Sequence, residues 1–151
     1  MSEDSRHMTP LTRQQALDKL AAAPFGRVVF TQHAMPALRH VNHIISHGQI
    51  IIRSHYDAAI TAHAAPGDGT VVLYQADDIN PATRTGWTVT VTGRARLITD
   101  PAKAAVYLEL IHPWVTGSKS HIISITADIV TGFELTPDLS SHHPRARPPA
   151  P

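Results

Sequence analysis

The sequence predicts a mainly β protein, a β-barrel with a few helices. Its clearest strand is 86–97, where Trp87, Val89 and Val91 alternate with polar residues, so that one face is apolar. Another strand carries consecutive isoleucines at 50–52, a run that indicates burial on both faces. Short turns join most strands, and a compact antiparallel set of this kind avoids exposed edges by closing into a barrel.

The overall composition is that of one ordinary globular domain. The chain has 151 residues, a formal net charge of +1 and no cysteine. The near-neutral charge argues against a nucleic-acid-binding face, and the lack of cysteine excludes a disulfide scaffold, a thiolate metal site and a cysteine nucleophile. No apolar run reaches about 20 residues, so we expect no transmembrane helix, and the polar N-terminus lacks the apolar core of a signal peptide. A cytoplasmic location is therefore expected.

Three helices are predicted, two of them from capping signals. Thr12 and Gln15 fit a capping box ahead of an apolar stripe. Asp100 is a good N-cap, with Pro101 at the first helical position. A third helix is expected in the alanine-rich segment 56–65.

The remaining ordered residues form strands, and we expect a single domain at 11–136. The predicted strands are 26–31, 38–46, 49–54, 70–76, 86–97, 121–126 and 129–135. Segment 77–85 is expected to be a loop, and Gly93 to mark a bulge or a sharp corner within its strand. Residues 1–10 and 137–151 carry little apolar mass and are expected to be disordered tails.

A few residues stand out chemically. Arg53 and Ser54 end an apolar strand before a predicted helix, which suits a phosphate site but equally suits an exposed arginine beside a serine helix cap. Asn42 interrupts a strand of valine and isoleucine, so it is expected to hydrogen-bond something specific, either as part of a site or as a satisfied core amide. Trp87 and Trp114 are suited to stacking on a planar ligand or a partner chain, or to the core.

Several common sites are not supported. The chain has 11 histidines, but no pair has helical spacing near an acidic partner, so no metal site is expected. It also has no Gly-x-Ser-x-Gly elbow, no phosphate-binding P-loop and no dinucleotide-binding glycine motif.

Taken in order, the motifs resemble the pyridoxamine 5′-phosphate oxidase-like FMN-binding split-barrel family, most of all its small actinobacterial branch related to flavin and deazaflavin oxidoreductases. The matching segments are Gly26-Arg-Val-Val-Phe, Arg39-His-Val-Asn-His-Ile-Ile, Ile50-Ile-Ile-Arg-Ser, Asp77-Asp, Gly86-Trp-Thr-Val-Thr-Val-Thr-Gly-Arg-Ala and His112-Pro-Trp. They cover about residues 12–136. The resemblance implies a six-stranded antiparallel split barrel of Greek-key type.

The resemblance also implies a homodimer that binds FMN in two grooves at the dimer interface. In the family, the strand that matches 39–43 lies along the flavin, largely through backbone groups. The end of the next strand holds the phosphate, and the start of the strand that matches 86–97 approaches the ring or the ribityl chain. The implied cofactor-binding residues are Arg39, Val41, Asn42, His43, Arg53, Ser54, Trp87 and Thr88. No catalytic side chain is implied, because the flavin carries the chemistry.

One position departs from the family's pattern. The family usually has a basic residue shortly after the strand-end arginine, where this chain has Ala59, with Asp57 close by. The change should weaken phosphate binding, because one charge-assisted contact is worth about 1.5–3 kcal/mol. Three functions therefore stay open: an FMN-dependent oxidoreductase acting on a small planar substrate by hydride transfer, a deazaflavin-coenzyme-dependent reductase, and a non-catalytic dimeric module that binds flavin or haem.

Overall fold

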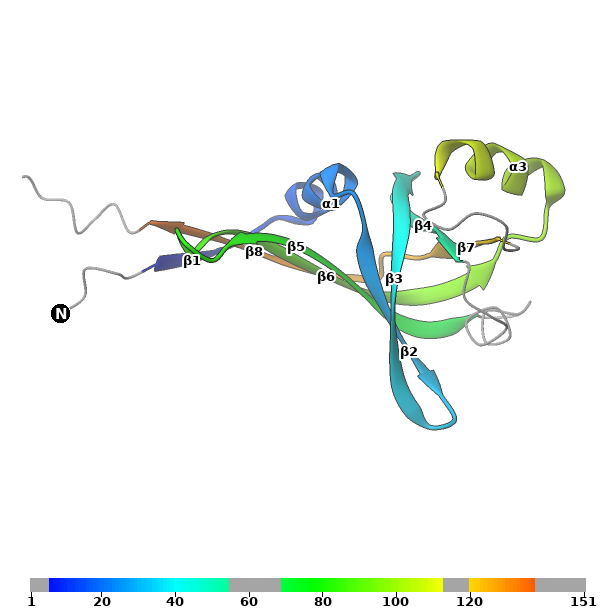
Figure 1. Cartoon of the computed structure of the whole chain (residues 1–151), viewed down its shortest axis with the longest axis horizontal. Coiled ribbons are helices and arrows are strands. Elements are labelled where there is room, and N and C mark those ends of the chain that lie inside the picture. The colour runs from blue at the N-terminus through cyan, green and yellow to red at the C-terminus, as the bar shows by residue number, and fades with distance from the viewer. Residues whose placement is uncertain (1–5, 55–68, 113–119, 138–151) are drawn as a thin grey trace, which may run out of the picture.

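The computed structural model describes residues 6–54, 69–112 and 120–137, and Figure 1 shows their arrangement. Within these ranges the helices are α1 (Arg13–Ala22) and α3 (Pro101–Leu110). The strands are β1 (Arg6–Pro10), β2 (Gly26–Gln32), β3 (Met35–Ser46), β4 (Gln49–Ser54), β5 (Thr70–Asn80), β6 (Thr85–Leu97), β7 (His121–Ile125) and β8 (Ile129–Pro137).

Six of these strands close into an antiparallel barrel. The ring runs from β2 to β3, β4, β7, β6 and β5, and β5 pairs back onto β2. β8 pairs with the first half of β6, and β1 pairs with β8, so these two strands extend the sheet beyond the barrel. In Figure 1 this extension reaches to the left, while α3 lies at the right. The predicted six-stranded antiparallel barrel is confirmed, with β8 and β1 added to it.

Gly93 is the point at which β6 changes partner. Residues 86–92 pair with β8, whereas residues 95–97 pair with β7. A Cβ atom at Gly93 would overlap the carbonyl oxygen of Thr126, which belongs to the connection between β7 and β8. Glycine is therefore required here by close backbone approach, at the corner where β6 leaves the extension and enters the barrel wall.

α1 begins with the predicted capping box and packs against the main core. The backbone N–H of Gln15 donates to Thr12 Oγ1 at 3.2 Å, and the backbone N–H of Thr12 donates to Gln15 Oε1 at 2.9 Å. The buried residues of this helix are Ala16, Leu17 and Leu20. They join the apolar side chains of the barrel interior in one cluster.

The three isoleucines of β4 are buried on both faces of the strand, as predicted. Ile50 and Ile52 are fully buried in the main core. Ile51 points the other way and packs with Ile111 and Ile122 in a second, smaller core beside α3. The barrel wall at β4 therefore has α3 on its outer side, because alternate side chains of a strand face opposite sides of the sheet.

The N-terminal segment differs from the prediction. Residues 6–10 form β1, which pairs with β8 from Arg6↔Pro137 to Pro10↔Phe133, so the expectation of a disordered tail at 1–10 is wrong for these residues. The reason is the free edge of β8, whose backbone groups pair with any nearby extended chain. A polar segment without apolar periodicity can therefore still form a strand.

The segment predicted as a loop at 77–85 is largely a hairpin. β5 continues to Asn80 and β6 begins at Thr85. Asn80 Oδ1 accepts a hydrogen bond from the backbone N–H of Ala82 at 2.9 Å, and Arg84 takes a positive φ of 55°. These features make a tight turn, so the strand ladder runs almost to its end.

Some predictions fall outside the described ranges. These are the helix at 56–65, the residues Asp57, Ala59 and Trp114, and the ends of the chain before 6 and after 137. Within the ranges that the structure covers, no helix has both the length and the apolar character needed to cross a membrane.

Candidate functional site

Asn42 and Arg53 lie directly opposite each other on β3 and β4. Opposed residues share one face of a sheet, and both of these side chains reach the end of α3. Asn42 Nδ2 donates to the carbonyl oxygen of His112 at 2.5 Å. Arg53 Nη1 donates to the carbonyl oxygens of Leu108 at 2.9 Å and Ile111 at 2.8 Å. The two side chains therefore hold the C-terminal end of α3 against the barrel.

The positive charge of Arg53 is not paired with a carboxylate in the described part of the chain. Its third hydrogen bond runs from Nε to Ser120 Oγ at 2.9 Å, so all three partners are neutral groups. The carbonyls at the end of a helix carry a partial negative charge that stabilises a cation, but they do not neutralise it. The charge of Arg53 is therefore not neutralised by any described carboxylate and can attract an anion.

Asn42 contributes a buried hydrogen-bond acceptor to the same face of β3 and β4. Its Oδ1 atom is buried, and no residue in the described ranges donates a hydrogen bond to it. A buried acceptor without a donor costs about 1–3 kcal/mol, so such atoms call for an explanation. A donor from a bound ligand would satisfy this one.

Ser54 does not share the face of Arg53. Ser54 is fully buried, whereas Arg53 is half-buried against α3. Successive side chains of a strand point to opposite sides, so the hydroxyl of Ser54 faces the barrel interior. The structure thus separates the two residues that the sequence placed together on a phosphate.

Val41 and His43 also point into the barrel. Their exposed fractions are only 5% and 7%, and His43 Nε2 lies 2.6 Å from the carbonyl oxygen of Leu20 in α1. The ring of His43 meets the ring of Tyr74 edge-on, with 5.3 Å between the centroids. These two side chains belong to the core, so Val41 and His43 can meet a ligand only through their backbone groups.

Arg39 lies opposite Val28 of β2, on the same face of β3 as Val41. Its Nη1 donates to the carbonyl oxygen of Leu38 at 2.9 Å, and its guanidinium lies 5.7 Å from the centre of the Phe30 ring. A cation above an aromatic face is weakly attracted to it. Arg39 is therefore held along the β2–β3 ribbon and does not join the Asn42–Arg53 contact.

Trp87 lines a different region, a cavity of about 500 Å³ between the end of α1 and the β5–β6 ribbon. Phe25 lines the same cavity, together with the charged residues Lys19, Arg27 and Asp77. Two aromatic faces beside charged groups suit a planar, polar ligand. Of these five residues only Trp87 was predicted as a site residue, although Arg27 and Asp77 lie within the family's motifs.

A chain of hydrogen bonds connects this cavity to Thr88. Arg27 Nη1 donates to Gln75 Oε1 at 2.9 Å and lies 3.6 Å from Asp77 Oδ2. Gln75 Nε2 donates to Asp77 Oδ2 at 2.7 Å and to Thr88 Oγ1 at 3.4 Å. The pairs Arg27↔Gln75 and Asp77↔Thr88 are cross-strand partners, so only knowledge of the strand register could have revealed this network.

Four of the predicted site residues therefore form two groups in one chain, Asn42 with Arg53 and Trp87 with Thr88. Trp87 pairs with Asp78 on β5 and Glu134 on β8, within the extension of the sheet. Arg53 lies beside β7 and α3, and Figure 1 shows α3 at the opposite end of the molecule from the extension. No group of three His, Cys, Asp or Glu side chains in the described ranges is placed to hold a metal ion.

Comparison with known proteins identifies the family. A family model described as pyridoxamine 5′-phosphate oxidase matches residues 12–138, a span that includes both groups of predicted site residues. The chain belongs to the pyridoxamine 5′-phosphate oxidase family. The resemblance that the ordered motifs carry is thereby confirmed.

Three individual proteins are also similar to this chain. The uncharacterized protein Rv0080 of Mycobacterium tuberculosis is 40% identical over 138 residues, which cover 90% of this chain and 91% of that protein. The crystal structure of the FAD binding protein from Mycobacterium smegmatis is 25% identical, with a TM-score of 0.69, and the match covers 83% of this chain and 97% of that one. The FAD and heme binding protein from Mycobacterium smegmatis shares the fold, with 14% identity, a TM-score of 0.64, and coverage of 90% and 80%.

Proposed function

We propose that this protein binds a flavin on the face formed by β3 and β4 beside the end of α3. The observation that carries the proposal is Asn42 Oδ1, a buried acceptor with no donor in the described ranges, opposite the guanidinium of Arg53. A flavin nucleotide offers both complementary groups, because its phosphate is an anion and its ribityl hydroxyls and ring N–H are donors. The residues present therefore fit the group.

Arg53 and Asn42 would bind and orient the flavin. Arg53 would attract the phosphate while it keeps its bonds to Leu108 and Ile111, and Asn42 would fix the orientation of the flavin through one hydrogen bond. When bound, the flavin would supply hydride transfer between a reduced donor and a small planar acceptor. We propose FMN as the cofactor, and the FAD binding protein from Mycobacterium smegmatis makes FAD the alternative to test beside it.

We further propose that the protein works as a homodimer in which the Trp87 cavity of one copy meets the β3–β4 face of the other. One chain keeps the two groups of residues at opposite ends, and a second copy would unite them. Trp87 in the cavity would then contact the flavin of the other copy, and the cavity would receive the planar substrate beside it.

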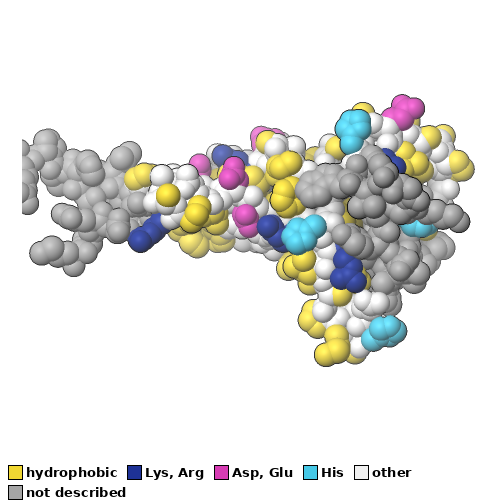
Figure 2. Space-filling model, in the orientation of Figure 1, with side chains coloured by type: hydrophobic (Ala, Val, Ile, Leu, Met, Phe, Trp, Pro, Cys, Tyr) yellow, Lys and Arg dark blue, Asp and Glu magenta, His cyan; other side chains and the backbone are white. Residues whose placement is uncertain are grey.

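An apolar row on the outer face of the sheet supports the dimer. Strand register places Leu38, Val29, Leu73, Thr92 and Ile129 side by side across five strands. Leu38 is 45% exposed and Ile129 is 63% exposed. Figure 2 shows that hydrophobic side chains also gather at the tip of the β2–β3 hairpin. Apolar surface of this extent is typical of an interface between subunits.

The test is the near-ultraviolet and visible absorption of the purified protein, before and after incubation with FMN or FAD and removal of free cofactor. We expect a flavin spectrum that stays with the protein and a loaded protein that oxidises reduced nicotinamide in the presence of a planar acceptor. A colourless protein that takes up neither flavin would contradict the proposal. Uptake of only a deazaflavin coenzyme, or of only haem, would contradict it as well and would favour the corresponding alternative.

A further inference from the structure

A cleft of about 720 Å³ lies between α3 and the barrel, with walls from the β3–β4 turn, the end of β6, and β7. Its volume is within the range of about 300–1,000 Å³ that is typical of small-molecule sites. Ser46 and Gln49, which line it, are cross-strand partners, four residues along each strand from Asn42 and Arg53. At about 3.4 Å per residue this separates them from the proposed flavin contacts by about 13 Å.

The helix above the cleft is apolar but not buried. Seven of the ten residues of α3 are Ala, Val, Tyr or Leu, yet none of its side chains is buried. Val106 is 57% exposed and Leu110 is 56% exposed, and both line the cleft. A helix of this composition ordinarily buries one face against a core. α3 therefore leaves apolar surface available on the side where the cleft opens.

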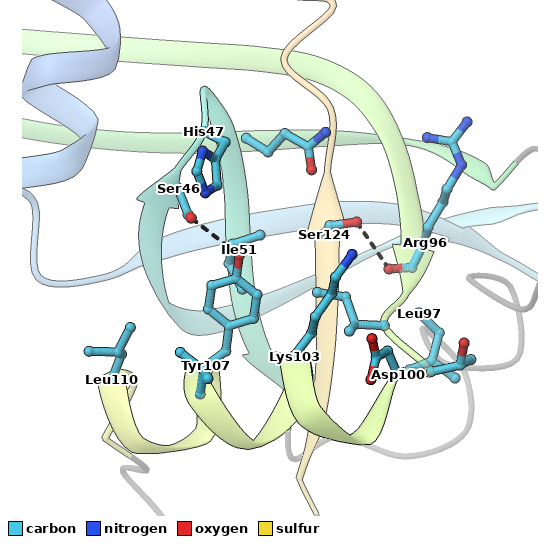
Figure 3. Close-up of a pocket in the computed structure, with 14 residues that line it drawn as sticks. Ser46, His47, Ile51, Arg96, Leu97, Asp100, Lys103, Tyr107, Leu110 and Ser124 are labelled. Carbon is cyan, nitrogen blue, oxygen red and sulfur yellow. Dashed lines mark hydrogen bonds between the residues drawn. The ribbon is translucent and has the colours of Figure 1, made fainter.

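Polar groups of α3 face the strands across the cleft. In Figure 3 the side chains of Lys103 and Tyr107 rise from α3 toward the strands, and the Tyr107 hydroxyl lies 3.2 Å from Ser46 Oγ. The Lys103 ammonium has no hydrogen bond or ion pair with any residue that the structure describes. Asp100, the carboxylate at the rim, is engaged as the N-cap of α3 through the N–H of Ala102 at 3.0 Å. Among the described residues, the Lys103 ammonium is therefore an unpaired cation beside the apolar side chains of the cleft.

We propose that this cleft binds a small amphipathic carboxylate, with its anionic head at Lys103 and its apolar chain between α3 and the barrel. Ile51 on β4 and Leu110 on α3 would contact the chain from opposite sides, and the Tyr107 and Ser46 hydroxyls would offer donors to the head. Asp100 is already engaged as the N-cap of α3, whereas Lys103 has no ion pair with any described residue, which favours an anion at Lys103. This site is independent of the flavin.

The experiment titrates the full-length protein with sodium octanoate and with octan-1-ol, and follows the backbone amides by ¹H–¹⁵N NMR. We expect saturable shifts in α3 and the β3–β4 turn, with octanoate binding more tightly than octan-1-ol. Hexanoate should bind more weakly than octanoate, because each added methylene group contributes about fourfold when it is buried.

Two charge variants locate the carboxylate, and a third variant tests the apolar contact. Lys103→Gln should weaken octanoate about fivefold and leave octan-1-ol unchanged, because an exposed ion pair contributes at most about that factor. Arg96→Gln is the matched control, because it removes the same charge from a side chain that Figure 3 shows pointing away from α3. It should keep the preference for octanoate. Leu110→Gln changes an exposed side chain, so it should weaken both ligands without unfolding the protein.

Several results would overturn the proposal. Equal affinity for octanoate and octan-1-ol would show that Lys103 does not bind the carboxylate. An equal loss of octanoate affinity in Lys103→Gln and Arg96→Gln would show a nonspecific charge effect. Displacement of octanoate by FMN would show that the cleft belongs to the flavin site. Shifts of the α3 amides with protein concentration alone would show that a second copy of the chain covers this surface.

Discussion

The hydroxyl of Tyr74 donates a hydrogen bond to Nδ1 of His43 at 2.5 Å inside the barrel. Nε2 of the same ring donates to the carbonyl oxygen of Leu20 at 2.6 Å. The carbonyl partner assigns the proton to Nε2, so His43 is the neutral tautomer and links the barrel wall to α1. Burial lowers the pKa of His43 and raises that of Tyr74, which keeps the pair in this arrangement at neutral pH.

Stability should therefore fall as the pH drops below about 6.5. Burial lowers the pKa of His43 from its ordinary value of 6.5, although the bond to Leu20 opposes the shift. Below that value the unfolded chain binds a proton that the folded chain does not, so the free energy of unfolding decreases by about 1 kcal/mol between pH 7.5 and 5.5. Urea denaturation at the two pH values measures this. His43→Gln should lose this contribution and His40→Gln should retain it, and an equal pH dependence in both variants would show that His43 is not the source.

Replacement of Gly93 by alanine should destabilise the barrel severely. The added Cβ would overlap the carbonyl oxygen of Thr126, which is held in place because the Thr126 N–H donates to the carbonyl oxygen of Arg94 at 3.1 Å. We expect Gly93→Ala to lower the free energy of unfolding by at least about 3 kcal/mol. Gly48→Ala is the control, because its Cβ meets open space and only its φ of +72° is unfavourable, at a cost of about 1 kcal/mol. Similar losses in the two variants would disprove the close approach at Gly93.

Removal of the Asn42 amide should affect flavin binding more than folding. Asn42→Ala removes one hydrogen bond to His112 but also removes a buried acceptor without a partner, so stability should change by less than about 1 kcal/mol. Flavin affinity should fall about fivefold, in line with one neutral hydrogen bond. Ser46→Ala, on the same face of β3, should leave flavin affinity unchanged. Unaltered flavin affinity in Asn42→Ala would show that Asn42 does not bind the flavin.

Mixing two variants tests whether a site is shared between subunits. Arg53→Gln and Trp87→Ala should each reduce the flavin bound per chain, since each damages one half of the proposed site. After the two variants are co-refolded in equal amounts, random dimers should have about a quarter of their sites with both native residues. Recovery of flavin binding to about that fraction is the expected result. No recovery would mean that the two residues do not act across an interface.

The barrel could be predicted because its signals are local. The alternation of Trp87, Val89 and Val91 and the run of isoleucines at 50–52 each specify how a strand is buried, whatever its neighbours. The capping box at Thr12 and the N-cap at Asp100 likewise depend only on adjacent residues. The order of the motifs then indicated the family.

The site could be predicted only in part, because its contacts join distant segments. Arg53 stood out as a strand-end cation, but its engagement by the carbonyls of Leu108 and Ile111 depends on where α3 packs. Ser54 shows the same difficulty, since one step along a strand reverses the face that a side chain occupies. Residues 6–10 form a strand only because β8 offers a free edge, which their own sequence does not reveal.

The central claim, that Arg53 attracts the phosphate of a flavin, is tested most directly by comparing the affinities of FMN and riboflavin, which differ only in that phosphate. Fluorescence quenching should show that the unaltered protein binds FMN at least about tenfold more tightly than riboflavin, because a charge-assisted contact is worth about 1.5–3 kcal/mol. Arg53→Gln should abolish most of this difference, and Arg53→Lys, which keeps the charge, should retain part of it. Equal affinity of the unaltered protein for the two flavins, or binding of neither, would contradict the claim.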